Sequence, residues 1–324
     1  VIARSAATKQ SSINYLRFRM NGLLRQALRA FLAMTTVLLL SSCSQLSNKD
    51  TLHMNLGTEP PSLDWNIAQD YSSFEIISNI MVGLTRFAND GNGEAISRAG
   101  CAKSWEISSD GLTYTFHLDP QAHWTDGQQL RSQDFIDSFK RLLDPATAAP
   151  YAELLSMIDL KQTSAIDDQT LQIKLKYPAS YFIYLTSFGI TYPIRLDLIK
   201  RYGNNWTEPK NLVTNGPFKL KEWQHEYKIL LERNDSFFQD PAKIKYIKYF
   251  MVAEQASAFT LYQNNQFDWI DNRSIPVSEH RRISSMPNAR RFLLLRNNFI
   301  GFNTQKKPFN DKRVRQAFSF AIDR

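Results

Sequence analysis

The chain has 324 residues, of which 43% are hydrophobic and 22% charged, a balance typical of a folded globular protein. Its formal net charge of +8 would suit a nucleic-acid-binding protein, but residues 1–42 hold six basic side chains and no acidic one. Without these six charges the net charge falls from +8 to +2. A second basic region, residues 281–324, is interpreted as one whose acidic neighbours lie elsewhere, with a nucleic-acid patch as the alternative. We therefore expect no nucleic-acid partner.

Residues 1–42 have the pattern of an export signal. Arg25 and Arg29 precede the mostly apolar residues 31–40, and two serines follow. This apolar run is too short to span a bilayer, which needs roughly 20 apolar residues. A basic head, a short apolar centre and a small-residue end are instead typical of a secretory signal. With Met20 as the start of this signal, the residues before it form an upstream extension.

The end of this segment points to a lipid anchor. Residues 40–43, Leu-Ser-Ser-Cys, resemble the lipobox of bacterial lipoproteins, in which the cysteine receives a lipid and becomes the first residue of the mature protein. We expect Cys43 to be lipidated and the protein to reach the membrane through this anchor only. Cys101 is then left without a partner, so no disulfide is expected in the processed chain. A simple signal with a coincidental cysteine is the alternative.

Hydrophobic periodicity predicts alternating strands and helices in the rest of the chain. A strand is predicted at 51–56, and a helix at 72–82 that opens with a capping box from Ser72. Residues 104–118 predict a β-hairpin with an Asp-Gly turn, and residues 132–143 predict a helix. Further strands are predicted at 170–175, 217–222, 227–232, 244–251 and 292–302, and further helices at 196–202, 254–264 and 312–322. This interleaving predicts a mixed α/β fold.

Motifs of common catalytic sites are missing from the sequence. It contains no G-x-S-x-G, H-E-x-x-H, P-loop or C-x-x-C pattern. The five histidines are scattered, and no two of them have the spacing of metal ligands on a helix. No nucleophile, base and oxyanion site can be assembled from these residues. We therefore expect no enzyme activity, no cofactor and no metal site.

Three longer stretches, at 104–145, 213–238 and 300–324, carry a family resemblance in this order. Together they resemble the family-5 extracellular solute-binding proteins of ABC importers, and within that family the oligopeptide-binding members. "SLDWN" at 62–66 and "PATAAPYAELL" at 145–155 extend the resemblance, which covers residues 51–324 with modest departures. Asn-Gly-Pro at 215–217 is expected to reverse the chain sharply, because glycine admits positive φ.

The resemblance implies a two-lobed fold of the periplasmic-binding-protein type II, with an extra inserted domain. We expect residues 43–81 and 196–298 to form lobe I, with 82–195 as the inserted domain and 299–324 as the start of the second lobe. Family members continue well beyond the part that matches residues up to 324. The resemblance therefore implies that the second lobe is largely missing from this chain, together with the acidic residue that pairs with a peptide amino terminus.

The same resemblance implies a function in transport. The expected protein is a monomeric, lipid-anchored receptor in the bacterial periplasm or cell envelope. It would capture oligopeptides and deliver them to ABC permease subunits. An extended peptide would be held by main-chain hydrogen bonds, as in strand addition. A different solute, such as a nickel complex, haem or a sugar, is one alternative. A truncated surface lipoprotein without a transport role is another.

Matching the sequence to the family gives six candidate ligand-binding residues, and an ordinary loop role is the alternative for each. Two groups follow predicted strands, and one residue lies in the "PYAELL" stretch. The candidates are Gln69, Asp70, Tyr71, Tyr151, Asp271 and Asn272.

Overall fold

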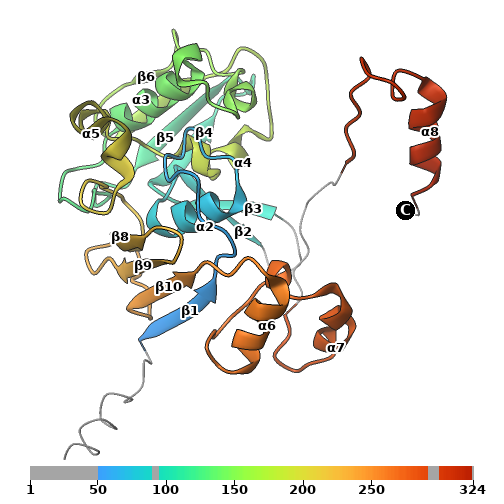
Figure 1. The fold of residues 1–324 in the computed structure, drawn as a ribbon. Helices are drawn as coiled ribbons and strands as arrows, with labels where there is room; N and C mark the ends of the chain where they lie inside the picture. Colours follow the sequence, from blue (N-terminus) through green and yellow to red (C-terminus); the bar gives the residue numbers. More distant parts are fainter. Residues whose placement is uncertain (1–49, 90–94, 291–298, 323–324) are drawn as a thin grey trace, which may run out of the picture. The chain divides into compact units, whose positions relative to one another are not determined.

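The computed structural model describes residues 50–89, 95–290 and 299–322, and these form two compact units (Figure 1). The first unit ends at Val277 and the second begins at Ser278. The predicted export signal and Cys43 lie outside the described residues. Within the described parts of the chain, no helix is both long and apolar enough to cross a membrane.

Sheet A of the first unit joins the beginning of the described chain to a much later segment. Its strand order is β1 (Thr51–Asn55), β10 (Tyr246–Phe250), β9 (Lys228–Arg233) and β8 (Phe218–Gln224). β1 is parallel to β10, and the other two neighbouring pairs are antiparallel. Two neighbouring parallel strands need a long crossover connection between them. Here the segment that connects β1 to β10 contains all four strands of the other four-stranded sheet, sheet C.

Sheet C has the order β4 (Ala102–Ile107), β5 (Thr113–Leu118), β7 (Thr170–Lys174) and β6 (Ser164–Ala165). The predicted hairpin is confirmed, and Gly111 in its turn has φ of +67°. The predicted helix is also confirmed as α3 (Ser132–Leu143), which buries Phe135, Phe139 and Leu142. Figure 1 shows sheets A and C as separate parts of the first unit. A third, two-stranded sheet of β2 (Thr85–Asn89) and β3 (Ala95–Ala99) was not predicted.

Helix α2 (Tyr71–Ile80) begins one residue earlier than predicted, and its cap differs from the prediction. Asp70 is the N-cap, and its side chain accepts hydrogen bonds from the backbone N–H (2.9 Å) and the hydroxyl (2.6 Å) of Ser73. Ser72 is buried inside the first turn, with its hydroxyl 3.0 Å from that of Thr58. The predicted capping box from Ser72 is therefore wrong, and the carboxylate of Glu75 is available for other contacts.

The remaining elements follow the predictions in most places. The predicted helices near 196–202, 254–264 and 312–322 are confirmed, whereas part of the strand predicted at 292–302 lies outside the described residues and 299–302 forms no strand. The other helices are α4 (Phe182–Leu185), α5 (Leu196–Tyr202), α6 (Gln255–Gln263), α7 (His280–Ser284) and α8 (Lys312–Phe320). Short 3-10 helices are η1 (Pro145–Thr147), η2 (Ala152–Leu155), η3 (Gly189–Thr191), η4 (Gly203–Thr207), η5 (Asn272–Ser274) and η6 (Val277–Glu279).

The second unit has a small aromatic cluster of its own. Phe302, Phe309 and Phe318 have ring centroids 5.1–5.8 Å apart, so α8 packs against the segment that precedes it. Phe318 is still 44% exposed, and Phe320 is 85% exposed. The apolar side predicted for this helix is therefore only partly covered by the described residues of its own unit.

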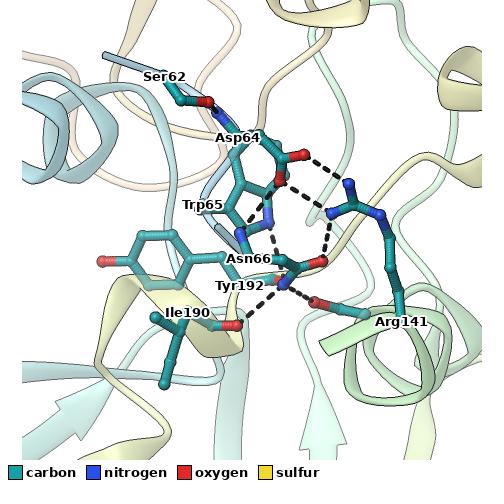
Figure 2. Close-up of polar contacts among 8 residues, drawn as sticks. Ser62, Asp64, Trp65, Asn66, Arg141, Ile190 and Tyr192 are labelled. Atoms are coloured by element: carbon teal, nitrogen blue, oxygen red, sulfur yellow. Dashed lines mark hydrogen bonds and ion pairs between the residues drawn. The ribbon is translucent and has the colours of Figure 1, made fainter. Parts of the chain in front are cut away.

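A buried ion pair connects the loop after β1 to α3 (Figure 2). The Arg141 guanidinium donates to both carboxylate oxygens of Asp64, with its nitrogens 2.9 and 2.5 Å from them, and to Oδ1 of Asn66 at 2.9 Å. The Asp64 side chain is 7% exposed and that of Arg141 is 19% exposed. A bidentate pair of this kind fixes both the distance and the orientation of the two segments.

The same loop contacts the chain around η3. The Trp65 indole N–H donates to the carbonyl of Tyr192 at 3.3 Å, and the Asn66 side-chain amide donates to the carbonyl of Ile190 and to the Ser138 hydroxyl. Figure 2 shows these bonds converging on "SLDWN". The conspicuous sequence motif is therefore a structural junction among three distant segments.

Gly216 is needed for close packing and not for a positive φ, which corrects the reason expected for glycine at this position. Gly216 is not among the glycines with positive φ in the part of the chain that the structure describes. A Cβ atom at Gly216 would lie only 2.3 Å from the carbonyl carbon of Ile80, at the end of α2. Beside it, the Asn215 side chain accepts from the Val82 N–H and donates to the Val82 carbonyl. Glycine and asparagine together therefore join the start of β8 to the end of α2.

Most of the buried hydrophobic residues of the first unit form one cluster, in which Met54 is the first residue along the chain and Tyr249 the last. It includes side chains of both sheets, such as Leu231 of sheet A and Phe116 of sheet C. The division into lobe I (43–81 and 196–298), an inserted domain (82–195) and the start of a second lobe (299–324) stays a prediction.

Arg141→Met should lower the free energy of unfolding by about 3 kcal/mol, because it leaves the Asp64 carboxylate buried without its cation. Urea unfolding followed by tryptophan fluorescence measures this change. Lys140→Met is the matched control, since Lys140 is an exposed neighbour on the same helix and should change the stability by less than about 0.5 kcal/mol. Equal losses in the two variants would contradict the importance of the ion pair.

Candidate functional site

The candidate site lies at the carboxyl ends of the parallel strands β1 and β10. Open α/β sheets bind ligands beyond the carboxyl ends of their parallel strands, where the chain leaves the sheet in different directions. Here β1 ends at Asn55 and β10 ends at Phe250, paired in register. The start of α2 and the segment 271–274 reach this end of the sheet.

Asn55 holds that end together. Its amide nitrogen donates to the Val252 carbonyl at 3.0 Å and to the Ser274 hydroxyl at 2.9 Å. Its carbonyl oxygen accepts from the backbone N–H groups of Val252 and Gly57. Asn55 is 4% exposed, so leaving these polar atoms unpaired would be costly. This one side chain therefore fixes 271–274 beside the end of β1.

Tyr71, Asp271 and Arg273 form one contact group. The Arg273 guanidinium carbon lies 3.4 Å from the centre of the Tyr71 ring, and its Nε donates to Asp271 at 2.5 Å. Asp271 also caps η5 by accepting from the Arg273 N–H. The residue Tyr71 is 54% exposed, whereas the Asp271 side chain is only 11% exposed. Two of the predicted residues are thus brought together by an arginine that was not predicted.

A second group of contacts joins α2 to β10. The Tyr249 hydroxyl donates to Oε1 of Glu75 at 3.1 Å, and the Asn79 amide donates to the Tyr249 oxygen at 3.2 Å. Burial, followed by the charge of Glu75 and a hydrogen bond to it, raises the pKa of Tyr249. Burial and then the charge of Glu75 raise the pKa of Tyr71 above its ordinary value of 10.0, while Arg273 opposes the rise. Both tyrosines are therefore neutral donors at physiological pH.

Tyr151 lies beside another predicted residue. Its hydroxyl donates to the Gln69 carbonyl at 3.2 Å, and its ring packs edge-on against Phe188 at 5.8 Å. The Phe74 ring of α2 completes the aromatic group. These contacts place Tyr151 near the residues that lead into α2.

The six predicted residues thus fall into different environments. Gln69 contacts Tyr151, and Tyr71 joins Asp271 through Arg273. Asp70 uses its carboxylate to cap α2, and Asn272 is exposed at the start of η5. Their binding roles stay predictions. Sequence reasoning missed three members of the cluster: Glu75, Tyr249 and Arg273. The local pattern assigns Glu75 to a capping box and Tyr249 to a strand, and Arg273 carries no local signal of its own.

The described residues contain no group of three or more His, Cys, Asp and Glu side chains that could hold a metal ion. Cys101 is fully buried, and burial raises the pKa of its thiol well above the usual range. Such a thiol is poorly suited to act as a nucleophile. The functional groups at the candidate site are aromatic rings, hydroxyls, amides and carboxylates.

Comparison with known proteins identifies the class. The bacterial extracellular solute-binding proteins of family 5 match residues 98–324, and the chain belongs to this family. It is 32% identical over 299 residues to the periplasmic oligopeptide-binding protein OppA of Salmonella typhimurium, covering 86% of this chain and 54% of OppA. It is 30% identical over 295 residues to the dipeptide-binding protein DppE of Bacillus subtilis, covering 86% of this chain and 53% of DppE. The chain thus spans about half the length of these curated relatives.

Solved structures agree with this family and show the α/β fold of periplasmic oligopeptide-binding proteins. A periplasmic oligopeptide-binding protein of Borrelia burgdorferi has a TM-score of 0.73 at 28% identity, covering 84% of this chain and 57% of that one. Haemophilus influenzae OppA in complex with the peptide RPPGFSPFR has a TM-score of 0.73 at 25% identity, covering 86% of this chain and 57% of that one. The predicted family and fold class are confirmed.

The pKa of Tyr71 should respond to its two charged neighbours in opposite directions. Glu75→Gln removes a negative charge and should lower the pKa toward 10.0. Arg273→Met removes a positive charge and should raise the pKa further. Carbon NMR of labelled tyrosine during a pH titration follows the Tyr71 ring, and tyrosines outside the cluster serve as internal controls. A titration that neither variant shifts would show that the contacts in the cluster do not form.

Proposed function

We propose that this protein is an extracytoplasmic solute-binding protein that captures oligopeptides and passes them to the permease of an ABC importer. The observation that carries this proposal is the family match over residues 98–324, together with the likeness to peptide-binding relatives of the same fold. The family consists of solute-binding proteins, which supports a role in binding without catalysis.

The geometry of the candidate site supports a peptide ligand. Gln69, Tyr71, Tyr151, Asp271 and Asn272 lie around the start of α2 or the carboxyl ends of the parallel strands. Exposed tyrosine rings offer large contact areas with few rotamers to immobilise. Hydroxyl, amide and carboxylate groups beside them can pair with the main chain of an extended peptide. Asp70 contributes by fixing the first turn of α2.

We also propose that the protein acts as a monomer in the periplasm or cell envelope, anchored through a lipid on Cys43. Two relatives are themselves periplasmic oligopeptide-binding proteins of Salmonella typhimurium and Escherichia coli. The lipobox-like residues 40–43 support the anchor. ABC permease subunits would be the protein partners, as in the importers that the family serves.

Peptide binding is tested with a mixed pool of tri- to pentapeptides, using ligand-observed NMR because this method registers weak binding. The chain should bind peptides, and Tyr71→Ala should weaken binding about 10-fold, because it removes an aromatic contact worth roughly 1.5 kcal/mol. Tyr177→Ala is the matched control, since Tyr177 is a tyrosine of similar exposure, 48% against 54%, in the loop before α4. Native mass spectrometry of co-purifying ligand separates peptides from a nickel complex, haem or a sugar. Binding of one of those solutes in place of peptides would contradict the proposal.

The lipid anchor has its own test. In bacteria grown with labelled palmitate, the protein should become labelled, and Cys43→Ala should abolish the labelling. Cys101→Ala, which alters the other cysteine, should leave the labelling intact. Labelling that persists in Cys43→Ala would exclude the lipobox interpretation.

A further inference from the structure

The cluster around α2 carries more negative than positive charge. Glu75 and Asp271 contribute two carboxylates, whereas Arg273 contributes one guanidinium. Asp271 and Arg273 form an ion pair with each other at 2.5 Å. Among the described residues, Glu75 has no ion-pair partner within 4.0 Å. The carboxylate of Glu75 is therefore a charge of this cluster that no cationic side chain pairs with.

Hydrogen bonds fix the orientation of that carboxylate. Because the Asn79 amide donates to the Tyr249 oxygen, the Tyr249 hydroxyl directs its own hydrogen toward Oε1 of Glu75. A carboxylate offers about four acceptor positions, so the bond from Tyr249 leaves acceptor capacity for a ligand. Glu75 is thus held in place while it remains able to accept further hydrogen bonds.

A ligand that contacts the exposed Tyr71 ring would also meet Glu75. The two residues are four positions apart on α2, so their side chains lie on the same face of the helix. Glu75 is only partly buried, and Tyr71 is 54% exposed. Lys248, in contrast, alternates with Tyr249 along β10 and therefore points to the other face of sheet A. The nearby lysine consequently does not neutralise this face.

We infer, resting on the proposed peptide binding, that Glu75 makes this site selective for peptides with a cationic side chain, lysine or arginine, next to Tyr71. A charged N–H donor would pair with the oriented carboxylate in a charge-assisted hydrogen bond, which is stronger than a neutral one. An acidic side chain in the same position would meet a like charge and be rejected. The expected preference for a cationic over a neutral side chain of the same shape is about 10-fold.

The test compares the tetrapeptides Ala-Arg-Arg-Ala, Ala-Cit-Cit-Ala and Ala-Glu-Glu-Ala on the full chain, with citrulline as the neutral isostere of arginine. Alternate side chains of an extended peptide point to opposite sides, so two adjacent identical residues place one of them toward Glu75 in either register. Ligand-observed NMR titrations should give about 10-fold tighter binding of the arginine peptide than of the citrulline peptide. A salt series separates a direct contact from long-range attraction, which salt screens.

Variants assign the preference to one side chain. Glu75→Gln should reduce the preference to about 2-fold or less, whereas Glu75→Asp keeps the charge and should retain part of it. Glu106→Gln, the same change at an exposed position of β4 in sheet C, should leave the preference unchanged. Thermal unfolding by circular dichroism confirms that each variant is folded.

The outcomes separate this inference from the proposed function. Equal binding of the arginine and citrulline peptides, or a preference that survives in folded Glu75→Gln, would overturn the inference and leave peptide binding intact. Tightest binding of the glutamate peptide would also overturn it and would transfer the selectivity to Arg273. Binding of none of the three peptides would contradict both the proposed function and the inference.

Discussion

The bidentate ion pair between Asp64 and Arg141 is the constraint on which the arrangement of the first unit depends. It joins the loop after β1 to the helix that covers sheet C, and it is largely shielded from water. Two buried charges are costly unless their geometry is good and their remaining polar atoms are paired, and Asn66 supplies part of that pairing. Sheets A and C can therefore share a continuous hydrophobic core, although no strand pairing described in the structure joins them.

The loop fixed by this ion pair continues directly into the candidate site. Residues 67–70 lead from "SLDWN" to the first turn of α2, where the Tyr71 ring contacts Arg273 of the segment 271–274. The other end of α2 is held by Asn215 and by the close approach of Gly216. The helix that carries Tyr71 and Glu75 is thus fixed at both ends by packing and hydrogen bonds. Such pre-organisation reduces the entropy that a ligand must overcome on binding.

The site is built from neutral tyrosines around carboxylates, not from a reactive group. Burial and the nearby charge of Glu75 raise the pKa of both Tyr71 and Tyr249, so their hydroxyls stay protonated and act as donors. The thiol of Cys101 is buried and protonated. These properties suit reversible recognition, and they agree with the membership of the chain in a family of solute-binding proteins.

The sequence by itself determined the local elements and the family. The hairpin of β4 and β5 follows from alternation and an Asp-Gly turn, and α3 follows from the spacing of its apolar residues, because both signals act within a few residues of chain. Part of the candidate site was also predicted, since Tyr71 and Asp271 do belong to one cluster. Only the tertiary structure decided that Glu75 binds Tyr249, that Arg273 stacks on Tyr71, and that Gly216 serves close packing and not a left-handed turn. The physical reason is that these contacts join residues far apart in the sequence, and local periodicity carries no information about which distant segments will meet.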